Sequence, residues 1–338
     1  MTGVEPVGEA PRDRLGLHGL DYRIPEAADR WPYMLGGLTA ALLLMLLLTG
    51  LYLEQYYQPN PVGARDSVLY IITRAPLGDW IRSLHYWSAG ALTITIPGHL
   101  GYVFWRRSYR KPREVTWWAG VALGGLVFLL MVTGIVLRGD QEGFESLAHL
   151  SGGGKMLQAV GGSFFTDAFT PSTSLLARMF TLHTSLLPLL TILIVGLHFW
   201  LIRQLGINAD ASGTAVFRDH LIRLSGLALL LYALIGVLAV AAPEGLGYPP
   251  VPGMEVTKPF WPLLWVYGLE NVSGMWGMVI GPAVLAAFLV ALPLVDRGSD
   301  DRPGIRSPVG WVGVLIAVLV VGFWLYGRFG AAQAHLGM

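Results

Sequence analysis

Long runs of apolar residues, separated by shorter polar stretches, dominate this chain of 338 residues. A helix that crosses a bilayer needs about 17–25 mostly apolar residues, and seven runs reach that length. We therefore expect an all-α integral membrane protein rather than a soluble domain. The seven predicted transmembrane helices are Trp31–Leu53, Ser83–Trp105, Val115–Val136, Phe180–Leu201, Leu221–Ala242, Trp276–Leu294 and Val309–Tyr326.

The predicted helices form two groups. Residues 1–207 contain four helices and residues 208–338 contain three, so we expect a four-helix domain followed by a three-helix domain. The small and polar residues Asn208–Thr214 between them are typical of a linker. Two connections, Arg138–Ala177 and Ala242–Val272, are much longer than most loops. Loops of that length are commonly functional or covered by a partner.

The basic residues predict how the chain is oriented. With an odd number of spans, the two termini lie on opposite sides of the membrane. If the N-terminus is cytoplasmic, the loops on that side hold 15 of the 23 lysines and arginines, as the positive-inside rule requires. We therefore expect a protein of the prokaryotic cytoplasmic (inner) membrane, with its C-terminus on the outer side. Met1–Arg30 is polar, so no cleavable signal peptide is expected.

The amino-acid composition excludes all chemistry that depends on cysteine. Hydrophobic residues make up 54% of the chain and charged residues only 13%, and there is no cysteine. Without thiols the chain forms no disulfide, ligates no iron–sulfur cluster and attaches no haem through a thioether. Any haem that it binds is held non-covalently.

Four histidines lie inside these apolar runs. His85 and His99 are 14 residues apart, and His183 and His198 are 15 apart. At about 100° per residue, the first pair shares one helix face, and the second diverges by about 60°. Ionisable groups in a bilayer are costly and usually functional. Two such helices side by side would oppose the imidazoles in two pairs, one near each leaflet, as haem iron requires. The alternative is four unrelated histidines in packed cores.

Glycines repeat the same interval. Gly36 and Gly50 are 14 residues apart in the first span, as are Gly120 and Gly134 in the third. A flat macrocycle can approach a helix closely only where no side chain intervenes. The pattern therefore favours two stacked haems between four helices, although glycine also serves simple helix packing.

Several segments resemble cytochrome b of the bc and b6f complexes, most closely cytochrome b6 fused to its three-span subunit IV. The second span contains Arg82-Ser83-Leu84-His85-Tyr86-Trp87-Ser88-Ala89, and the third begins with Lys111-Pro112-Arg113-Glu114-Val115-Thr116-Trp117. The fourth contains Phe180-Thr181-Leu182-His183-Thr184 and Leu197-His198-Phe199, with the 15-residue gap of the b6 type. The likeness is strong over Arg14–Asn208 and weaker over Phe217–Gly330.

This resemblance implies a four-helix bundle with two non-covalent b-type haems. His85 and His183 would ligate the outer, low-potential haem, and His99 and His198 the inner, high-potential one. Arg82 matches a family arginine near the haem propionates, a role that suits its charge, although an arginine reaching toward the headgroups is an alternative. The family cysteine that anchors a c-type haem aligns with Met34, so we expect no c-type haem on this chain.

The outer quinol site departs from the family pattern. Its Pro-Glu-Trp-Tyr motif aligns with Pro259-Phe260-Trp261-Pro262, so phenylalanine replaces the carboxylate that accepts a quinol proton. The Leu-Pro-Trp motif aligns with Leu137-Arg138-Gly139-Asp140-Gln141, and an upstream tyrosine aligns with Ile135. Proton abstraction needs a base within hydrogen-bond reach. The acids that could replace it, unless they are simply solvated, are Asp140, Glu142, Glu255 and Glu270.

The inner, quinone-reducing site is better preserved. Arg203 follows the last histidine at the b6 spacing, and Arg218-Asp219-His220 resembles a basic and acidic pair beside that pocket. A cation, a carboxylate and an imidazole could polarise a quinone carbonyl and deliver protons. The alternative is a charged loop at the membrane edge. Asp21 and Asp29 are secondary candidates.

We therefore expect the electron-transfer subunit of a quinone-linked oxidoreductase. In this interpretation a di-haem cytochrome b carries electrons across the membrane between a quinone pool (menaquinone or ubiquinone) and a redox partner, and its outer quinol site is non-standard or inactive. One alternative is a complete bc-type quinol:cytochrome oxidoreductase subunit with a rebuilt outer site. Another is a haem-free anchor or transporter, although no internal repeat of the transporter kind is found in the sequence.

The resemblance also implies partners. A Rieske-type iron–sulfur subunit, or a c-type or multihaem cytochrome, would dock on the two long outer connections. Relatives form two-fold dimers, so we expect a homodimer within a larger complex. Lipid would surround the chain, and no nucleic-acid partner is expected.

Overall fold

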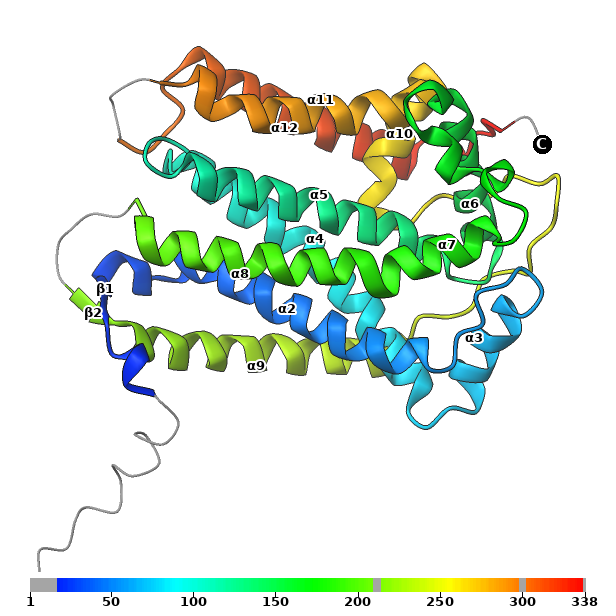
Figure 1. Cartoon of the computed structure of the whole chain (residues 1–338), viewed down its shortest axis with the longest axis horizontal. Helices are drawn as coiled ribbons and strands as arrows, with labels where there is room; N and C mark the ends of the chain where they lie inside the picture. Colours follow the sequence, from blue (N-terminus) through cyan, green and yellow to red (C-terminus); the bar gives the residue numbers. More distant parts are fainter. Residues whose placement is uncertain (1–16, 209–213, 298–301, 337–338) are drawn as a thin grey trace, which may run out of the picture.

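The computed structural model describes residues 17–208, 214–297 and 302–336 and is almost wholly helical (Figure 1). A helix forms at each of the seven predicted spans, within a few residues of the expected bounds. These long helices are α2 (Trp31–Glu54), α4 (Gly78–Trp105), α5 (Glu114–Val136), α7 (Leu175–Thr181) continuing through a π-helical turn (Leu182–Leu186) into α8 (Leu187–Leu205), α9 (Phe217–Ala241), α11 (Met275–Val295) and α12 (Pro308–Phe329).

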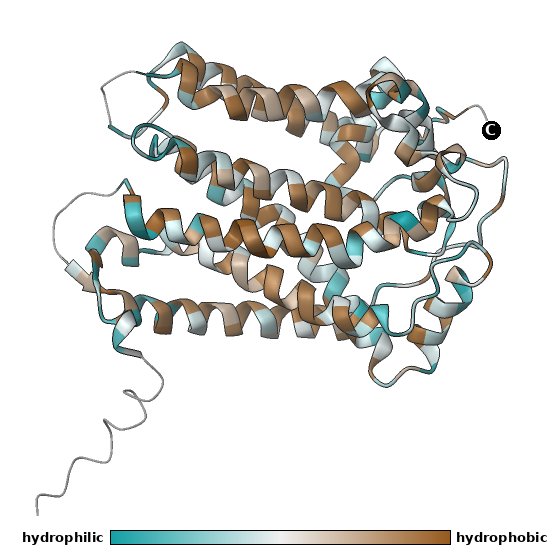
Figure 2. Cartoon of the chain, viewed as in Figure 1, coloured by the Kyte–Doolittle hydropathy of each residue, from teal (hydrophilic) through white to brown (hydrophobic). Residues whose placement is uncertain are grey.

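Six of these helices are long and apolar enough to cross a membrane by length and composition alone. The exception among the described residues is α4, which at 28 residues is long enough. Its sequence includes two histidines, several serines and threonines, and aromatic residues, which lower its mean hydropathy. It packs between α2 and α9, so protein rather than lipid surrounds much of it. Figure 2 shows hydrophobic residues along the helices and hydrophilic ones gathered at the two ends.

The helices pack in adjacent pairs. Helix α2 lies against α4, α5 lies against α8, α9 covers α2 and α4, and α11 contacts α5. One buried cluster joins both halves of the chain, because Leu42, Leu84 and Val127 pack with Ile235 and Ala239 of α9. The division at residue 207 therefore remains a prediction from the sequence, and residues 209–213 of the expected linker lie outside the described part of the chain.

Short elements close the two ends of the bundle. Helices α3 (Ala64–Thr73), α6 (Gln141–Met156) and α10 (Leu264–Ser273) gather with α7 and the C-terminal segment at one end (Figure 1). At the other end, β1 (Arg23–Pro25) pairs antiparallel with β2 (Thr214–Val216). The all-α expectation is confirmed, and this three-residue ladder is a small addition that forms where two extended segments leading into helices run side by side.

A buried polar cluster ties α11 to the turn between α4 and α5. Arg110 donates from Nη2 to Asp296 Oδ1 at 2.8 Å, and the Tyr109 hydroxyl donates to the other carboxylate oxygen. The side chains of Arg110 and Asp296 are only 7% and 5% exposed. Burial raises the pKa of Asp296, but the hydrogen bonds from Tyr109 and Arg110 outweigh it and hold that pKa below its usual range.

Replacing this carboxylate should loosen α11. Asp296→Asn removes the buried carboxylate charge that faces Arg110, and breaking a buried ion pair costs roughly 3–5 kcal/mol. We expect a lower thermal midpoint for the purified protein at neutral pH. Because the folded pKa is lowered, the wild-type advantage is full above about pH 4 and disappears as the pH falls through the folded value. Asp66→Asn, at an exposed carboxylate on α3, is the control, and an equal midpoint shift in both variants would contradict the assignment.

Candidate functional site

Each of the four histidines lies against one of the four glycines. The contacts are close enough that a methyl group on most of the glycines would crowd the imidazole. A Cβ would lie 3.0 Å from His99 Cε1 at Gly36, 3.5 Å from His85 Cε1 at Gly50, 3.4 Å from His198 Cε1 at Gly120 and 2.8 Å from His183 Cε1 at Gly134. The glycines therefore admit imidazole rings, and their role in admitting a macrocycle stays a prediction.

The outer histidines face each other. The ring centroids of His85 and His183 are 6.3 Å apart, with the ring planes at 64°. An imidazole nitrogen lies about 2 Å from a metal ion that it ligates. Two rings on opposite sides of one metal therefore have centroids about 6 Å apart, so the observed spacing fits a bis-histidine haem iron.

A π-helical turn in the fourth span changes the expected angle between His183 and His198 about the helix axis. His183 lies within Leu182–Leu186, where hydrogen bonds skip one more residue than in an α-helix. The turn absorbs the additional residue of the 15-residue gap, so the predicted divergence of about 60° is wrong. Both His183 and His198 contact α5, at Gly134 and Gly120, which share one face of that helix. Such turns are frequent at functional sites.

Threonines fix the protonation of the outer histidines. The hydroxyl of Thr49 lies 2.9 Å from His85 Nδ1, and that of Thr133 lies 3.0 Å from His183 Nδ1. Each hydroxyl donates its one proton to a backbone carbonyl, Met45 at 2.7 Å and Leu129 at 2.8 Å respectively. It must therefore accept from Nδ1–H, which leaves the lone pair on Nε2 for a metal.

Sequence analysis missed these threonines, although a signal exists. Thr49 and Thr133 directly precede Gly50 and Gly134, so the same dipeptide occurs at the outer end of two spans. At the inner level the corresponding residues are Leu35 and Ala119, which carry no hydroxyl. The two histidine levels therefore differ in their hydrogen bonding.

A cavity of about 430 Å³ contains the outer histidine pair. Its walls include His85, His183 and both neighbouring glycines, together with Arg82, Glu54, Glu244, Ile135 and Phe260. Arg82 donates to the backbone carbonyls of Glu244 and Gly245, so it holds the connection that leads to Phe260. Phe260 is buried and packs 5.0 Å from the ring of Tyr86. Sequence analysis did not single out the two cavity acids, Glu54 and Glu244.

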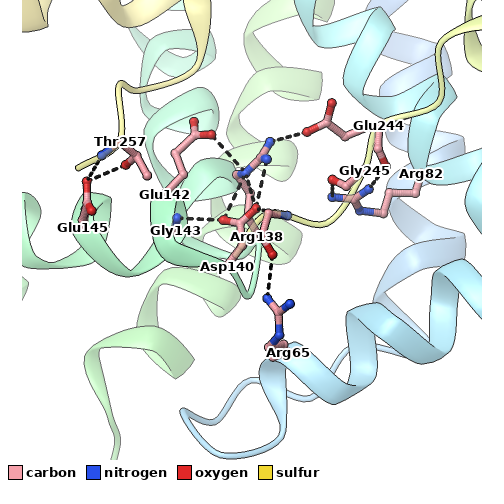
Figure 3. A network of polar contacts seen from close by, with 11 residues as sticks. Arg65, Arg82, Arg138, Asp140, Glu142, Gly143, Glu145, Glu244, Gly245 and Thr257 are labelled. Carbon is pink, nitrogen blue, oxygen red and sulfur yellow. Dashed lines mark hydrogen bonds and ion pairs between the residues drawn. The ribbon is translucent and has the colours of Figure 1, made fainter. Parts of the chain in front are cut away.

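Arg138 lies at the centre of a polar network beside this cavity (Figure 3). It contacts Asp140 at 3.0 Å, Glu142 at 3.4 Å and Glu244 at 2.6 Å. Asp140 also accepts a hydrogen bond from the backbone N–H of Gly143, and through this bond Asp140 caps the N-terminus of α6. Burial raises the pKa of Asp140, but Arg138 and these backbone bonds keep it below its usual value. Asp140 is therefore a structural ion, not a free base.

Of the four acids proposed from the sequence, Glu142 is closest in chemistry to a base. Burial raises its pKa to about 7, while Arg138 and a hydrogen bond from the Phe260 backbone act in the opposite direction. A base is most effective when its pKa lies near the working pH. Glu255 and Glu270 instead lie beside His149, away from the walls of the cavity.

The structure brings most of the inner candidates together. The guanidinium of Arg203 lies 4.9 Å from the ring of Tyr22, which stacks on Phe217, which in turn stacks on His220. His220 Nδ1 is 3.6 Å from Asp29. Arg218 contacts Asp21 and Asp219, both at 3.1 Å. The charged groups therefore line one end of the bundle, next to the β1–β2 ladder.

Opposed imidazoles inside a bundle of membrane-length helices are typical of membrane haem proteins of electron transport. The family model described as cytochrome b/b6/petB matches residues 20–206, more than half of the chain. The chain belongs to the cytochrome b family, whose members carry b-type haem and serve oxidoreductase complexes. The fold is also similar to a chain of a structure titled "Hyperthermophilic respiratory Complex III", with a TM-score of 0.73 and 20% identity over 95% of this chain and 97% of that one.

The raised pKa of Glu142 predicts a pH-dependent stability. Unfolding returns this carboxyl to its ordinary value of 4.5, so the folded protein retains a proton that the unfolded chain loses between about pH 5 and pH 7. Wild-type stability therefore falls over that range. Glu142→Gln lacks this loss, so the thermal midpoint of the variant should rise relative to wild type as the pH rises.

Glu145→Gln, on the same helix, is the matched control. Burial raises the pKa of Glu145, but hydrogen bonds from Thr257, Val256 and Gln141 hold it below its usual value. Its stabilising effect is full above about pH 4.5 and is lost only in stronger acid. A difference between Glu142→Gln and wild type that is constant from about pH 5 to pH 8 would contradict the raised pKa.

Proposed function

We propose that this chain is the di-haem subunit of a membrane quinone oxidoreductase and carries electrons between a quinone pool and a redox partner. The single observation that carries the proposal is the facing pair His85 and His183, with centroids 6.3 Å apart and Nε2 left free on each ring. These two would hold the outer haem. His99 and His198, placed against Gly36 and Gly120, would hold the inner one.

The haems supply reversible one-electron chemistry, and the chain supplies their environment. Thr49 and Thr133 orient the outer imidazoles through Nδ1. Arg82 lies in the cavity wall, where its charge suits a propionate. The rest of the cavity lining is mostly apolar and would surround a haem with a low-dielectric environment.

Quinone would react at the inner end. There Arg203, Arg218, Asp219 and His220 lie with Asp21 and Asp29 at the membrane edge. His220 Nδ1 lies at ion-pair distance from Asp29, whose other oxygen is paired with Arg223, so the carboxylate would stabilise a positive charge on the imidazole. The arginines would stabilise negative charge that develops on a quinone oxygen.

The outer site supports electron exchange better than quinol oxidation. Phe260 lines the cavity and cannot accept a proton, and Asp140 and Glu244 are paired with Arg138. In a linear route, an iron–sulfur, c-type or multihaem subunit exchanges electrons directly with the outer haem. That partner would dock on the connections around α6 and residues 242–263.

A second candidate, a complete quinol oxidoreductase with a rebuilt outer site, is favoured by Glu142. This residue lies next to Phe260, is part-buried and has a pKa raised to about 7. It does not line the cavity itself, but it contacts Arg138, which does, and it would take the quinol proton in place of the absent glutamate.

The likeness to a Complex III chain supports a place in a larger complex, as a two-fold homodimer in the prokaryotic inner membrane. We propose a cytoplasmic N-terminus and an outer C-terminus from the distribution of basic residues. The described ends of the chain lie at opposite ends of the bundle, as this orientation requires (Figure 1). Menaquinone or ubiquinone would be the quinone.

Removing one histidine should remove one haem. His85→Ala or His183→Ala should lower the b-haem content by about half and eliminate the low-potential component, because iron loses an axial ligand. His99→Ala or His198→Ala should eliminate the high-potential one. Haem extraction spectra and redox titration of the purified protein measure both effects. His18→Ala, at an exposed histidine, is the control. Unchanged haem content in the four variants would disprove the ligand assignment.

The two outer-site candidates are separated by Glu142→Gln, tested with quinol as the reductant. The linear route expects unchanged turnover, because no quinol proton passes through this residue. A rebuilt site expects a loss of about 100-fold, the usual contribution of a general base. Glu145→Gln serves again as the matched control, since its carboxylate is already bonded to Thr257.

A further inference from the structure

A second cluster of histidines and carboxylates lies at the same end of the bundle as α6 and α10. His149 comes from α6, Glu255 from the connection before Phe260, Glu270 from α10 and His335 from the C-terminal segment. His149 Nε2 is 3.2 Å from Glu255 Oε1 and 3.5 Å from Glu270 Oε1. His335 Nδ1 is 3.5 Å from Glu255 Oε1. Ligand-type atoms of His149, Glu270 and His335 all lie within 4.8 Å of one another. Glu255 lies against both histidines at the edge of this group.

These atoms are buried and lack hydrogen bonds. The side chains of Glu255 and Glu270 are each 4% exposed, His335 is 7% exposed and His149 is 16% exposed. Among the described residues, no hydrogen bond reaches His149 Nε2, either ring nitrogen of His335, or Oε1 of Glu255 or Glu270. More than about 90% of buried polar atoms in proteins have a partner. One ring nitrogen of His335 and the other three atoms belong to neighbouring side chains, which indicates a missing common partner.

Hydrogen bonds to the backbone determine which atoms of His149 and Glu255 face the cluster. His149 Nδ1 lies 2.8 Å from the carbonyl oxygen of Glu145, so Nδ1 carries the proton and Nε2 carries the lone pair. Glu255 Oε2 accepts from the backbone N–H groups of His335 and Leu336, at 2.8 and 2.9 Å, which leaves Oε1 free. Supporting bonds of this kind orient the ligands of metal sites.

The charges also match a cation. Two carboxylates and two neutral imidazoles carry a charge of −2, which one divalent ion neutralises, as burial requires. Protons alone would produce directed N–H···O bonds between imidazolium and carboxylate. The contacts of 3.2–3.5 Å are not hydrogen bonds, so these atoms do not pair with one another in that way. Two imidazole nitrogens and two carboxylate oxygens are donor types that zinc accepts in proteins.

We propose that His149, Glu255, Glu270 and His335 form a structural binding site for a divalent metal ion, with zinc as the favoured ion. The site is separate from the haem histidines, because none of the four residues lines the cavity around His85 and His183. The ion fastens the C-terminal segment and the connection before Phe260 to α6 and α10. It therefore holds the outer connection in place without taking part in electron transfer.

The test is the metal content of the purified full-length protein. After treatment with a chelator and reloading with zinc chloride, wild type should retain about one zinc per chain beyond its haem iron. His335→Ala and Glu270→Gln should each retain at least about tenfold less, because a ligand is lost. His18→Ala, at an exposed histidine, should retain as much as wild type. X-ray absorption at the zinc edge should show nitrogen and oxygen ligands only.

Two further measurements distinguish the loss of zinc from a failure of the variant to fold. The b-haem spectrum of each variant reports whether it has folded, independently of zinc. Chelation should lower the thermal midpoint of wild type and leave that of the folded Glu270→Gln variant unchanged. A wild-type protein that binds no zinc, or a His335→Ala variant that retains it fully, would overturn the proposal.

Discussion

The contact between four imidazoles and four glycines is the constraint on which the centre of the bundle depends. Because Gly36 and Gly50 admit the rings on α4, and Gly120 and Gly134 those on α8 and the π-helical turn before it, each histidine helix packs directly against its neighbour. Close-packed interiors transmit even small displacements. The 6.3 Å separation of the outer rings therefore depends on how closely these helix pairs approach each other.

The outer end of the bundle is organised by charge instead. One part-buried cation, Arg138, faces three carboxylates, and the three are not equivalent. Asp140 gains backbone N–H bonds and stays ionised, whereas burial favours the neutral form of Glu142. Glu142 is therefore the carboxyl group of this network that is protonated most readily, while the ion pairs of Arg138 hold the connection that leads to Phe260.

The sequence predicted the long helices well, because a membrane span must satisfy its own backbone and so appears as a continuous apolar run. The histidines and glycines were found because both follow the helical period. The short helices α3, α6 and α10 were missed, since their patterns are brief and partly polar. The pairing of Glu255 and Glu270 with His149 and His335 could not be foreseen either, because it depends on how distant connections fold over the bundle end.

The π-helical turn changes the orientation of the helical segment that precedes it. One additional residue rotates Leu175–Thr181, on its N-terminal side, by about 100° relative to the helix on its C-terminal side. The first segment can therefore bury Leu175, Arg178 and Met179 among the outer connections, while the helix beyond Leu186 keeps its own orientation in the membrane. Because of this turn, substitutions in Leu175–Thr181 can change the packing of that segment without changing the orientation of the membrane-spanning helix Leu187–Leu205.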